Sequence, residues 1–327
     1  MRLPELFRRA KRKPSILLYH RIADLDHDPW GIAVAPDLFE AQMEFLSNEC
    51  SPLSMPDFVE RARARRLKPD HVAVTIDDGY LDIATRAAPA LQRHAVPATI
   101  FVITAASQKG ARFWWDELAE ALLAREPATP NCIQLDGRSV SFDNIVGCPP
   151  LPGWLATDPP RNARERLFLD LYFELQVADD ATRNRFFDEL RQIFPPDRDG
   201  SARAMTMDEL RKLSAGGLIA LGGHTVTHPR LDKASEARVL AELTPCLEEL
   251  RDIFGLQSAG FAYPYGGKTV QIEAMVEDAG FAWACTTRSS TVEMRDRTFD
   301  LPRIVVGNWS AQQLRSALSG ASRRFVP

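Results

Sequence analysis

The sequence lacks the features that mark disulfide-stapled, membrane-spanning or nucleic-acid-binding proteins. Its 327 residues include five cysteines, an odd number without CxxC spacing, which indicates neither a disulfide framework nor a zinc ribbon. No apolar run reaches the roughly 18 residues that a transmembrane helix needs. A net charge of −4 gives no reason to expect a nucleic-acid partner. What remains is typical of a globular protein, with 45% hydrophobic and 26% charged residues.

No secretory signal is recognisable in the sequence either. Residues 1–13 are basic, but the apolar run that follows them extends only from Ser15 to Tyr19, too short for the apolar core of a signal peptide. We therefore expect a cytoplasmic protein. The basic residues have two interpretations, a solvated terminus or a weak contact with an anionic membrane surface.

Short β-rich apolar runs alternate with amphipathic stretches through most of the chain. The runs that predict strands are Ser15–Tyr19, Val72–Ile76, Thr99–Ile103, Leu218–Leu221, Gly260–Tyr263, Ala282–Thr286 and Arg303–Val306. Helical periodicity occupies Phe39–Leu46, Leu81–Gln92, Glu117–Leu123, Met207–Leu213, Ala234–Phe254 and Val270–Asp278. This alternation predicts parallel βαβ units with right-handed crossovers. Within the helix at 234–254, we expect Pro245 to cause a kink or a break.

One long interval does not follow the alternation. Residues 110–203 contain the Pro-rich turns Pro149-Pro150, Pro159-Pro160 and Pro195-Pro196, and an amphipathic span near 165–194. We interpret this interval as a helical insertion on the rim of a (β/α) barrel and not as a separate domain.

Polar side chains follow several of the predicted strands, where the chemistry of (β/α) barrels is found. These are His20 after the first strand, Asp77 and Asp78 after the second, and His224 and His228 after the fourth. One carboxylate and two imidazoles leave coordination positions open on a metal, and a second carboxylate can take a proton. The combination predicts a metal-dependent hydrolase.

Each part of this set has a simpler interpretation when it is taken alone. Asp-Asp-Gly is a common turn composition, and two histidines four residues apart can both be structural. Pro229 disfavours helical geometry at His228, so this spacing indicates a loop and not an HExxH helix. The ligand set also resembles the facial triad of non-haem iron oxygenases, whose sites usually lie on antiparallel β-barrels.

Three segments resemble successive motifs of the polysaccharide deacetylases, carbohydrate esterase family 4. They are Thr75-Ile76-Asp77-Asp78-Gly79, His224-Thr225-Val226-Thr227-His228 and Phe261-Ala262-Tyr263-Pro264-Tyr265-Gly266. The resemblance spans residues 14–310, leaves 110–203 unmatched, and implies an α/β fold, a distorted seven-stranded (β/α) barrel. Residues 1–13 then form a basic N-terminal segment and 311–327 a C-terminal helix or tail.

The resemblance also implies an activity and a set of roles. Family members hydrolyse N-acetyl groups of amino sugars with a divalent metal, usually zinc. By motif, Asp77 is the general base, a metal-bound water is the nucleophile, and the metal ligands are Asp78, His224 and His228. Tyr265, after Pro264, resembles the residue whose backbone N–H completes the oxyanion hole.

The chain departs from the family pattern in three places. Ala262 stands where many members have an Arg that orients the base, an Asp/Trp motif is not apparent near 282–287, and no Leu-x-His motif follows Leu301. His20 is a candidate general acid, with a structural histidine as the alternative. Arg303 is a candidate partner of Asp77 because its strand returns beside the site, with a surface salt bridge as the alternative.

The substrate follows less directly from the sequence. Trp115 and Asp116 are candidate sugar contacts, and aromatic core packing is the alternative for the tryptophan. We expect an amino sugar in a polysaccharide, an oligosaccharide, or a lipid-linked or nucleotide-linked precursor, with formyl as the alternative to acetyl. A sugar-binding pseudoenzyme is the non-catalytic alternative, although a binding module has no need of the intact aspartate and histidine set.

Overall fold

The computed structural model describes residues 12–127, 132–195 and 202–319. These residues form two compact units. The first comprises residues 12–24, 32–111 and 204–319, and the second comprises Leu25–Gly31 and Arg112–Arg203. Of the predicted basic segment 1–13, residues 1–11 lie outside the described residues, as does the end of the chain after residue 319.

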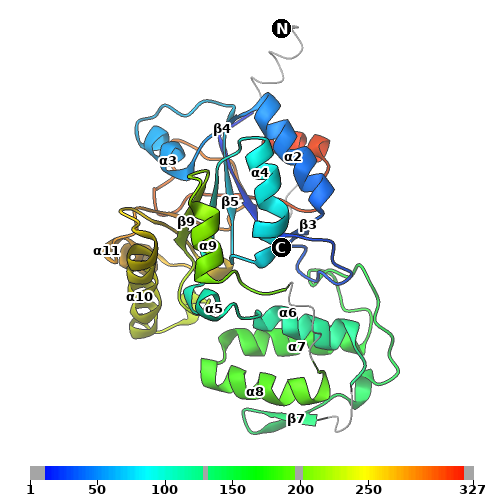
Figure 1. The fold of residues 1–327 in the computed structure, drawn as a ribbon. Coiled ribbons are helices and arrows are strands. Elements are labelled where there is room, and N and C mark those ends of the chain that lie inside the picture. The colour runs from blue at the N-terminus through cyan, green and yellow to red at the C-terminus, as the bar shows by residue number, and fades with distance from the viewer. Residues whose placement is uncertain (1–11, 128–131, 196–201, 320–327) are drawn as a thin grey trace. The chain divides into compact units, whose positions relative to one another are not determined.

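The first unit is built on a curled parallel sheet (Figure 1). Seven strands follow one another in the order β11-β10-β9-β6-β5-β1-β12, and every pair on this path is parallel. Their bounds are β1 Ser15–Tyr19, β5 His71–Ile76, β6 Ala98–Val102, β9 Ile219–Gly223, β10 Gly260–Ala262, β11 Trp283–Cys285 and β12 Ile304–Val305. Short β4 (Ser51–Pro52) also pairs with β5. All seven predicted strands are confirmed.

The sheet closes irregularly between its two outer strands. Leu301 forms an isolated parallel bridge with Cys285 of β11, and its N–H donates to the carbonyl of Ala284 (3.0 Å). Three residues later, Ile304 pairs with Leu17 of β1. One short stretch of chain therefore joins both edges, which confirms the predicted distorted seven-stranded (β/α) barrel.

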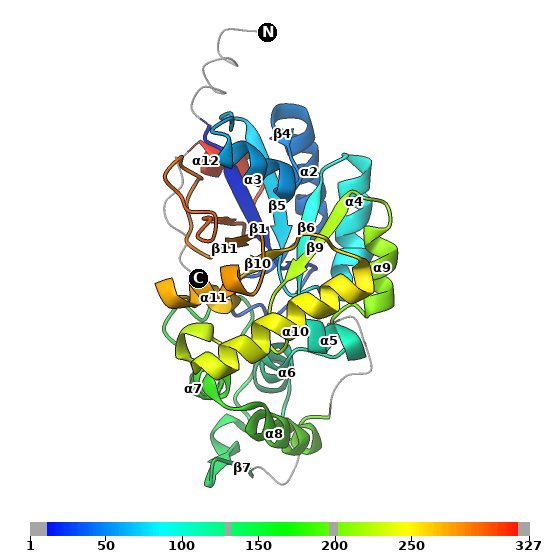
Figure 2. The same cartoon turned by 90° about the vertical axis from the view of Figure 1, so that its left-hand side faces the viewer.

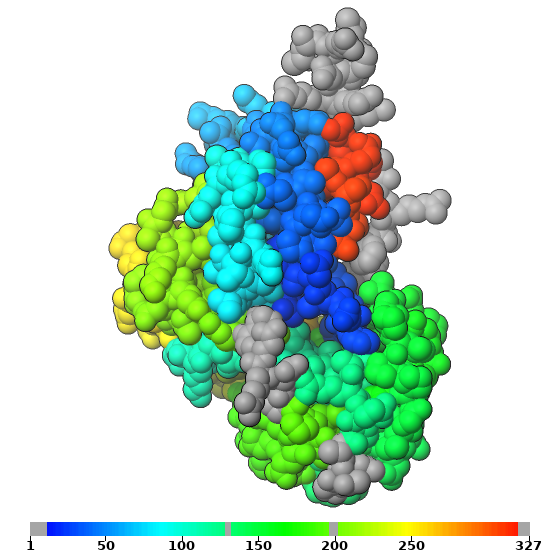
Figure 3. All heavy atoms as spheres, turned by 45° about the vertical axis from the view of Figure 1, so that its right-hand side comes forward, coloured from blue at the N-terminus to red at the C-terminus, as the bar shows by residue number. Residues whose placement is uncertain are grey.

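Helices cover the outside of this barrel (Figures 1 and 2). They are α2 Pro36–Glu49, α3 Met55–Arg63, α4 Ala88–Arg93, α5 Thr104–Lys109, α9 Met207–Ser214, α10 Glu236–Phe254, α11 Val270–Asp278 and α12 Ala311–Leu318. α12 lies against α2 (Figure 3), where Arg315 pairs with Glu49. In the described ranges, no helix is both long and apolar enough to cross a membrane.

Of the predicted kink or break at Pro245, the break is wrong, because α10 continues through this residue as one helix. A proline cannot donate a hydrogen bond to the carbonyl four residues earlier, here that of Ala241. Both Ala241 and Pro245 are exposed, so water can satisfy that carbonyl. The opposite face of α10 is buried against the barrel through Leu243, Leu247 and other apolar residues.

The second unit is mainly helical. It contains α6 Trp114–Ala119, which continues into a π-helical turn, the antiparallel hairpin β7 Cys132–Leu135 and β8 Arg138–Ser141, and the helices α7 Ala163–Val177 and α8 Asp180–Ile193. The amphipathic span predicted near 165–194 is thus two helices, because Asp179 caps a new one by accepting from the N–H of Thr182 (2.7 Å). Trp30 packs on Tyr172 inside this unit, with ring centroids 4.3 Å apart.

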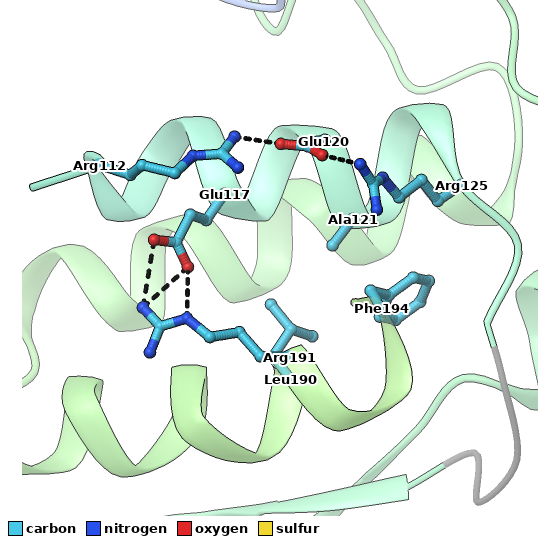
Figure 4. A pocket seen from close by; sticks show the side chains of 8 residues that line it. All are labelled: Arg112, Glu117, Glu120, Ala121, Arg125, Leu190, Arg191 and Phe194. Carbon is cyan, nitrogen blue, oxygen red and sulfur yellow. Dashed lines mark hydrogen bonds and ion pairs between the residues drawn. The ribbon is translucent and has the colours of Figure 1, made fainter. Parts of the chain in front are cut away.

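A small pocket in the second unit is closed by ion pairs (Figure 4). Glu120 pairs with both Arg112 and Arg125, and Glu117 accepts from Arg191 at 3.0 and 3.1 Å. The cavity of about 10 Å³ holds at most one water molecule. The Glu117–Arg191 pair therefore joins α6 to α8, and the pocket is too small to be a ligand site.

Candidate metal centre and catalytic pair

The two aspartates and the two histidines come from neighbouring parts of the sheet. Asp77 follows β5, and its N–H donates to the carbonyl of Tyr19 (2.9 Å). Asp78 then turns the chain with φ +69°. His224 follows β9, and its N–H donates to the carbonyl of Val102 at the end of β6 (2.9 Å). Because all these strands are parallel, their carboxyl ends bring the aspartates and the histidine to one end of the barrel.

Asp78, His224 and His228 form a buried triangle of ligand atoms. The two Nε2 atoms are 3.1 Å apart, and Oδ1 of Asp78 lies 3.5 Å from Nε2 of His224 and 3.6 Å from Nε2 of His228. Tetrahedral bonds of about 2.0–2.1 Å to zinc would separate ligand atoms by roughly 3.3–3.4 Å. The triangle therefore fits a divalent metal such as zinc, bound through three protein ligands.

His224 is held in the orientation that a metal ligand needs. Its Nδ1 lies 2.8 Å from the carbonyl oxygen of Ala262, so this nitrogen carries the proton and Nε2 keeps its lone pair toward the triangle. Burial lowers the pKa of His224, although the charge of Asp77 and the hydrogen bond to Ala262 oppose this. The imidazole is therefore neutral and ready to ligate. Residue 262, where the family arginine is missing, thus contributes its backbone carbonyl.

The loop between the two histidines is strained. Thr225 and His228 adopt φ +67° and +63°, the left-handed region that side chains other than glycine rarely occupy. Within the loop, Oγ1 of Thr225 accepts from the N–H of His228 (2.9 Å). Two residues at positive φ cost free energy, so further contacts around the loop must stabilise this backbone geometry.

Glu242 of α10 supplies those contacts, a role that the sequence analysis missed. Its Oε2 accepts from the N–H groups of Val226 (2.9 Å) and Thr227 (2.8 Å), and its Oε1 accepts from the Thr227 hydroxyl (2.7 Å). Arg238 balances its charge at 2.9 Å, and the carboxylate is 2% exposed. The available signal was a glutamate on the buried face of α10, next to Leu243.

Asp77 forms a buried two-point ion pair with Arg303. Nη1 and Nη2 of the arginine lie 2.7 and 2.8 Å from the two carboxylate oxygens, and both residues are at most 2% exposed. The guanidinium also donates to the carbonyl of Thr286 (2.9 Å) and the hydroxyl of Thr75 (3.2 Å). The alternative of a surface salt bridge for Arg303 is therefore excluded. Arg303, which directly precedes β12, lies where its guanidinium can orient the candidate base Asp77.

Two opposing influences set the pKa of Asp77. Burial is the largest and raises it, but the charge of Arg303, then that of His224, and the hydrogen bonds from Arg303 outweigh burial. The pKa therefore lies below its ordinary value, and Asp77 is an anion at neutral pH. An ionised carboxylate beside a metal site is the form that a general base requires.

His20 lies after β1 and shares the electrostatic environment of this pair. Burial lowers its pKa to about 4, while the charge of Asp77 opposes this and those of Arg303 and His224 add to it. The imidazole is thus neutral at pH 7. It can accept a proton there, and it must gain one before it can act as an acid.

Pro264 and Tyr265 form a tight turn beside the metal triangle. The turn η5 (Pro264–Gly266) follows β10, with Tyr265 at φ +55°. The Tyr265 ring centroid lies 4.6 Å from that of His228. Gly266 is required here, because an added Cβ would lie 2.1 Å from Oγ1 of Thr287. The turn thus holds residue 265 next to the histidines.

Trp115 and Asp116 belong to the second unit, and the metal triangle belongs to the first. Trp115 is 7% exposed and stacks on Phe113, with ring centroids 4.7 Å apart and an interplanar angle of 5°. This favours the core-packing alternative for the tryptophan. Asp116 lies in the first turn of α6, where a carboxylate stabilises the helix.

Comparisons with known proteins agree with the fold. The deacetylase PplD of Streptococcus pyogenes, solved in complex with acetate, has a TM-score of 0.60 at 17% identity and covers 94% of this chain and 98% of its own. IcaB from Ammonifex degensii has a TM-score of 0.59 at 17% identity, with coverage of 94% and 97%. A de-N-acetylase from Aggregatibacter actinomycetemcomitans has a TM-score of 0.54 at 12% identity, with coverage of 93% and 99%.

A parallel barrel with a buried aspartate and two histidines at its strand ends defines a class of barrel hydrolases, and it differs from the antiparallel barrels of most facial-triad oxygenases. The family model described as polysaccharide deacetylase matches residues 64–128 and 197–284, which contain Asp77, Asp78, His224 and His228. Over these two segments the chain matches the polysaccharide deacetylase family, whose members are hydrolases of carbon–nitrogen bonds. A search of curated protein sequences found no match.

Proposed function

We propose that this protein hydrolyses the N-acyl group, acetyl in the first instance, of an amino sugar in a glycan or glycan precursor. The strongest support is the geometry of one cluster, in which a buried ligand triangle lies beside an arginine-held aspartate. Oδ2 of Asp77 is 3.9 Å from Nε2 of His224. A metal site and an ionised base thus lie close enough to act on one water molecule.

The proposed cofactor is a divalent cation, zinc in the first instance, held by Asp78, His224 and His228. When bound there, it would polarise the acyl carbonyl and lower the pKa of a water molecule. The residues of the chain do the rest. Asp77 takes the proton as the water oxygen bonds to the acyl carbon, and the backbone N–H of Tyr265 is the proposed donor to the developing oxyanion.

The second half of the reaction requires a proton on the leaving amine. The carbon–nitrogen bond then breaks to give a carboxylate and a free amino sugar. We assign this proton to His20, which is neutral at rest and must first receive a proton released within the site. Arg303 keeps both oxygens of Asp77 engaged, so the base stays aligned through the cycle.

The first test measures metal content and acyl release together. Purified protein should contain one equivalent of zinc and release acetate from a panel of N-acetylated amino-sugar oligomers and precursors. Asp77→Asn should keep the metal and lose turnover by a factor of about 10² to 10⁴. Formate release from N-formyl substrates would identify a deformylase, and metal binding with sugar binding but no release would identify a pseudoenzyme. A fully active Asp77→Asn variant would refute the assigned base.

A further inference from the structure

A basic surface lies at the end of the barrel opposite the metal centre. The last turn of α3 carries Arg61 and Arg63, and the segment from there to β5 carries Arg65, Arg66 and Lys68, all five of them exposed. No acidic residue interrupts the stretch between Glu60 and Asp70. Lys13, just before β1, is exposed as well. We call these six residues the basic face, and they lie where β1 and β5 begin.

Contacts within the protein leave most of this charge available. Among the residues that the structure describes, no ion pair engages Arg61, Arg65, Arg66 or Lys68. Arg63 donates to the carbonyl of Ala282 (2.8 Å), which holds the segment on the barrel without neutralising it. Charges that are not paired inside the molecule can act on a partner outside it.

The basic face borders an open cavity of about 650 Å³. Lys13, Arg63 and Arg65 line one part of it, and its apolar walls are formed by Val59, Leu67, Val292, Leu301 and the exposed Met294. Two acids also reach the cavity, but Asp296 pairs with Arg288 (2.9 Å) and Glu293 with Arg295 (2.9 Å) and Lys13 (3.7 Å). The cavity thus combines apolar walls with guanidinium groups.

From this arrangement we infer that the basic face docks on a membrane surface rich in anionic phospholipid, with a lipid headgroup in the cavity beside Arg63 and Arg65. Each arginine or lysine near an anionic bilayer contributes about 1 kcal/mol. Met294, 75% exposed, suits the apolar boundary just below the headgroups. A nucleic acid offers no apolar layer in which the Met294 side chain could be buried. The net charge of −4 also disfavours binding of a long polyanion across the rest of the protein surface.

Docking at this end has a consequence for the metal centre. β5 begins at His71 beside the basic face and ends at Ile76, directly before Asp77. A membrane bound at one end of the strands therefore leaves the catalytic end uncovered and turned toward a glycan outside the headgroup layer. The inference does not depend on the proposed deacylation, because it concerns separate residues.

Vesicle sedimentation of the full chain tests this inference. The protein should bind vesicles of 70% phosphatidylcholine and 30% phosphatidylglycerol, bind pure phosphatidylcholine far more weakly, and be released by salt. The double variant Arg65→Gln/Arg66→Gln should bind about thirtyfold more weakly, because two contributions of about 1 kcal/mol are removed. The matched control Arg211→Gln/Lys212→Gln removes the same charge from exposed positions on α9 and should bind like the wild type.

Three results would overturn the inference. One is equal binding to both kinds of vesicle, or to neither. Another is that the Arg65/Arg66 and Arg211/Lys212 variants bind anionic vesicles equally weakly, which would show that the net charge of the protein, and not the basic face, controls the binding. The third is binding of a single-stranded oligonucleotide as tight as binding of the anionic vesicles and equally sensitive to Arg65 and Arg66. Thermal unfolding of each variant checks that the fold is retained.

Discussion

Arg303 shows how a residue from another strand can pair with Asp77 when the arginine of the family motif is absent. Ala262 occupies the motif position of the orienting arginine, yet a guanidinium reaches Asp77 from the segment before β12. The sequence allowed this partner to be proposed, because the last strand of a closed barrel returns beside the first. The supporting acceptors Thr75 and Thr286 could not be predicted, since they depend on the three-dimensional register of four strands.

Replacing Arg303 should change the pH dependence of the reaction. In Arg303→Gln, burial of Asp77 is no longer offset by its main counter-charge, so the pKa of this carboxyl rises. A base with a higher pKa is protonated at higher pH. The acid limb of kcat/KM should therefore move upward in pH, and kcat at pH 7 should fall by roughly a hundredfold. Zinc content should not change, because the three ligands are intact.

The matched control is Arg288→Gln, which removes an arginine that pairs with Asp296 (2.9 Å) and is partly exposed. It should leave the pH profile as in the wild type. An Arg303→Gln enzyme with a wild-type acid limb would show that another group sets this limb. The same ion pair stabilises the fold above the unfolded pKa of Asp77, near 3.8, and this contribution is lost as pH falls through the lower folded pKa.

The strands were predictable because a parallel barrel buries both faces of each one. His71–Ile76 is buried throughout, and such strands appear in the sequence as continuous β-branched runs. Helix boundaries depended more on tertiary context. Pro245 lies on the exposed face of α10, as does Ala241, whose carbonyl loses its helical donor; periodicity alone did not reveal that the helix would continue. The start of α8 did have a local signal, the capping residue Asp179.

α10 has two roles, since it covers the barrel and anchors the histidine loop through Glu242. Glu242→Ala removes three acceptor contacts from a loop with two residues at positive φ. Metal affinity should fall by about 10- to 100-fold, as expected when the support of a ligand is lost. Glu242→Gln keeps an acceptor for the two N–H groups and should fall in between. Competition with a zinc-specific chelator measures both without reference to activity.

The control for this experiment is Glu248→Ala, on the same helix at an exposed position. Its zinc affinity should equal that of the wild type. If Glu242→Ala bound zinc normally and only unfolded at lower temperature, Glu242 would stabilise the helix and would not position the histidines. The comparison thus separates a contribution to the metal site from one to packing.

The metal site lies within the first unit, and the inserted segment forms most of the second. Every residue of the proposed site other than Trp115 and Asp116 belongs to the first unit, and the second unit has its own aromatic core and ion pairs. The sequence analysis placed an insertion at 110–203 from its Pro-rich turns and irregular rhythm, and the second unit includes Arg112–Arg203. It did not indicate that Leu25–Gly31 would join the same unit, because that contact links segments far apart in the chain.

The two residues that flank the insertion, Ala111 and Ala204, are hydrogen-bonded to each other. The N–H of Ala204 donates to the carbonyl of Ala111 (2.9 Å), and Arg112 and Arg203 form an antiparallel bridge. Residues 112–203 can therefore be replaced by an Asn-Gly turn, which suits two antiparallel neighbours. The shortened protein lacks Tyr172, on which Trp30 packs, so Trp30 would become exposed. Trp30 is therefore changed to Ser in the shortened protein and also in the full-length reference.

The shortened protein should fold and bind one zinc with the affinity of the full-length reference, because Asp78, His224, His228 and Glu242 all remain. Circular dichroism and chelator competition measure the two properties, and His224→Ala in the shortened protein should abolish zinc binding. Folded protein without zinc would mean that the second unit completes the metal site. The shortened protein could also keep its zinc and lose acyl release only on longer oligomers. That result would show that the second unit recognises glycan length, which is compatible with a unit that has its own core.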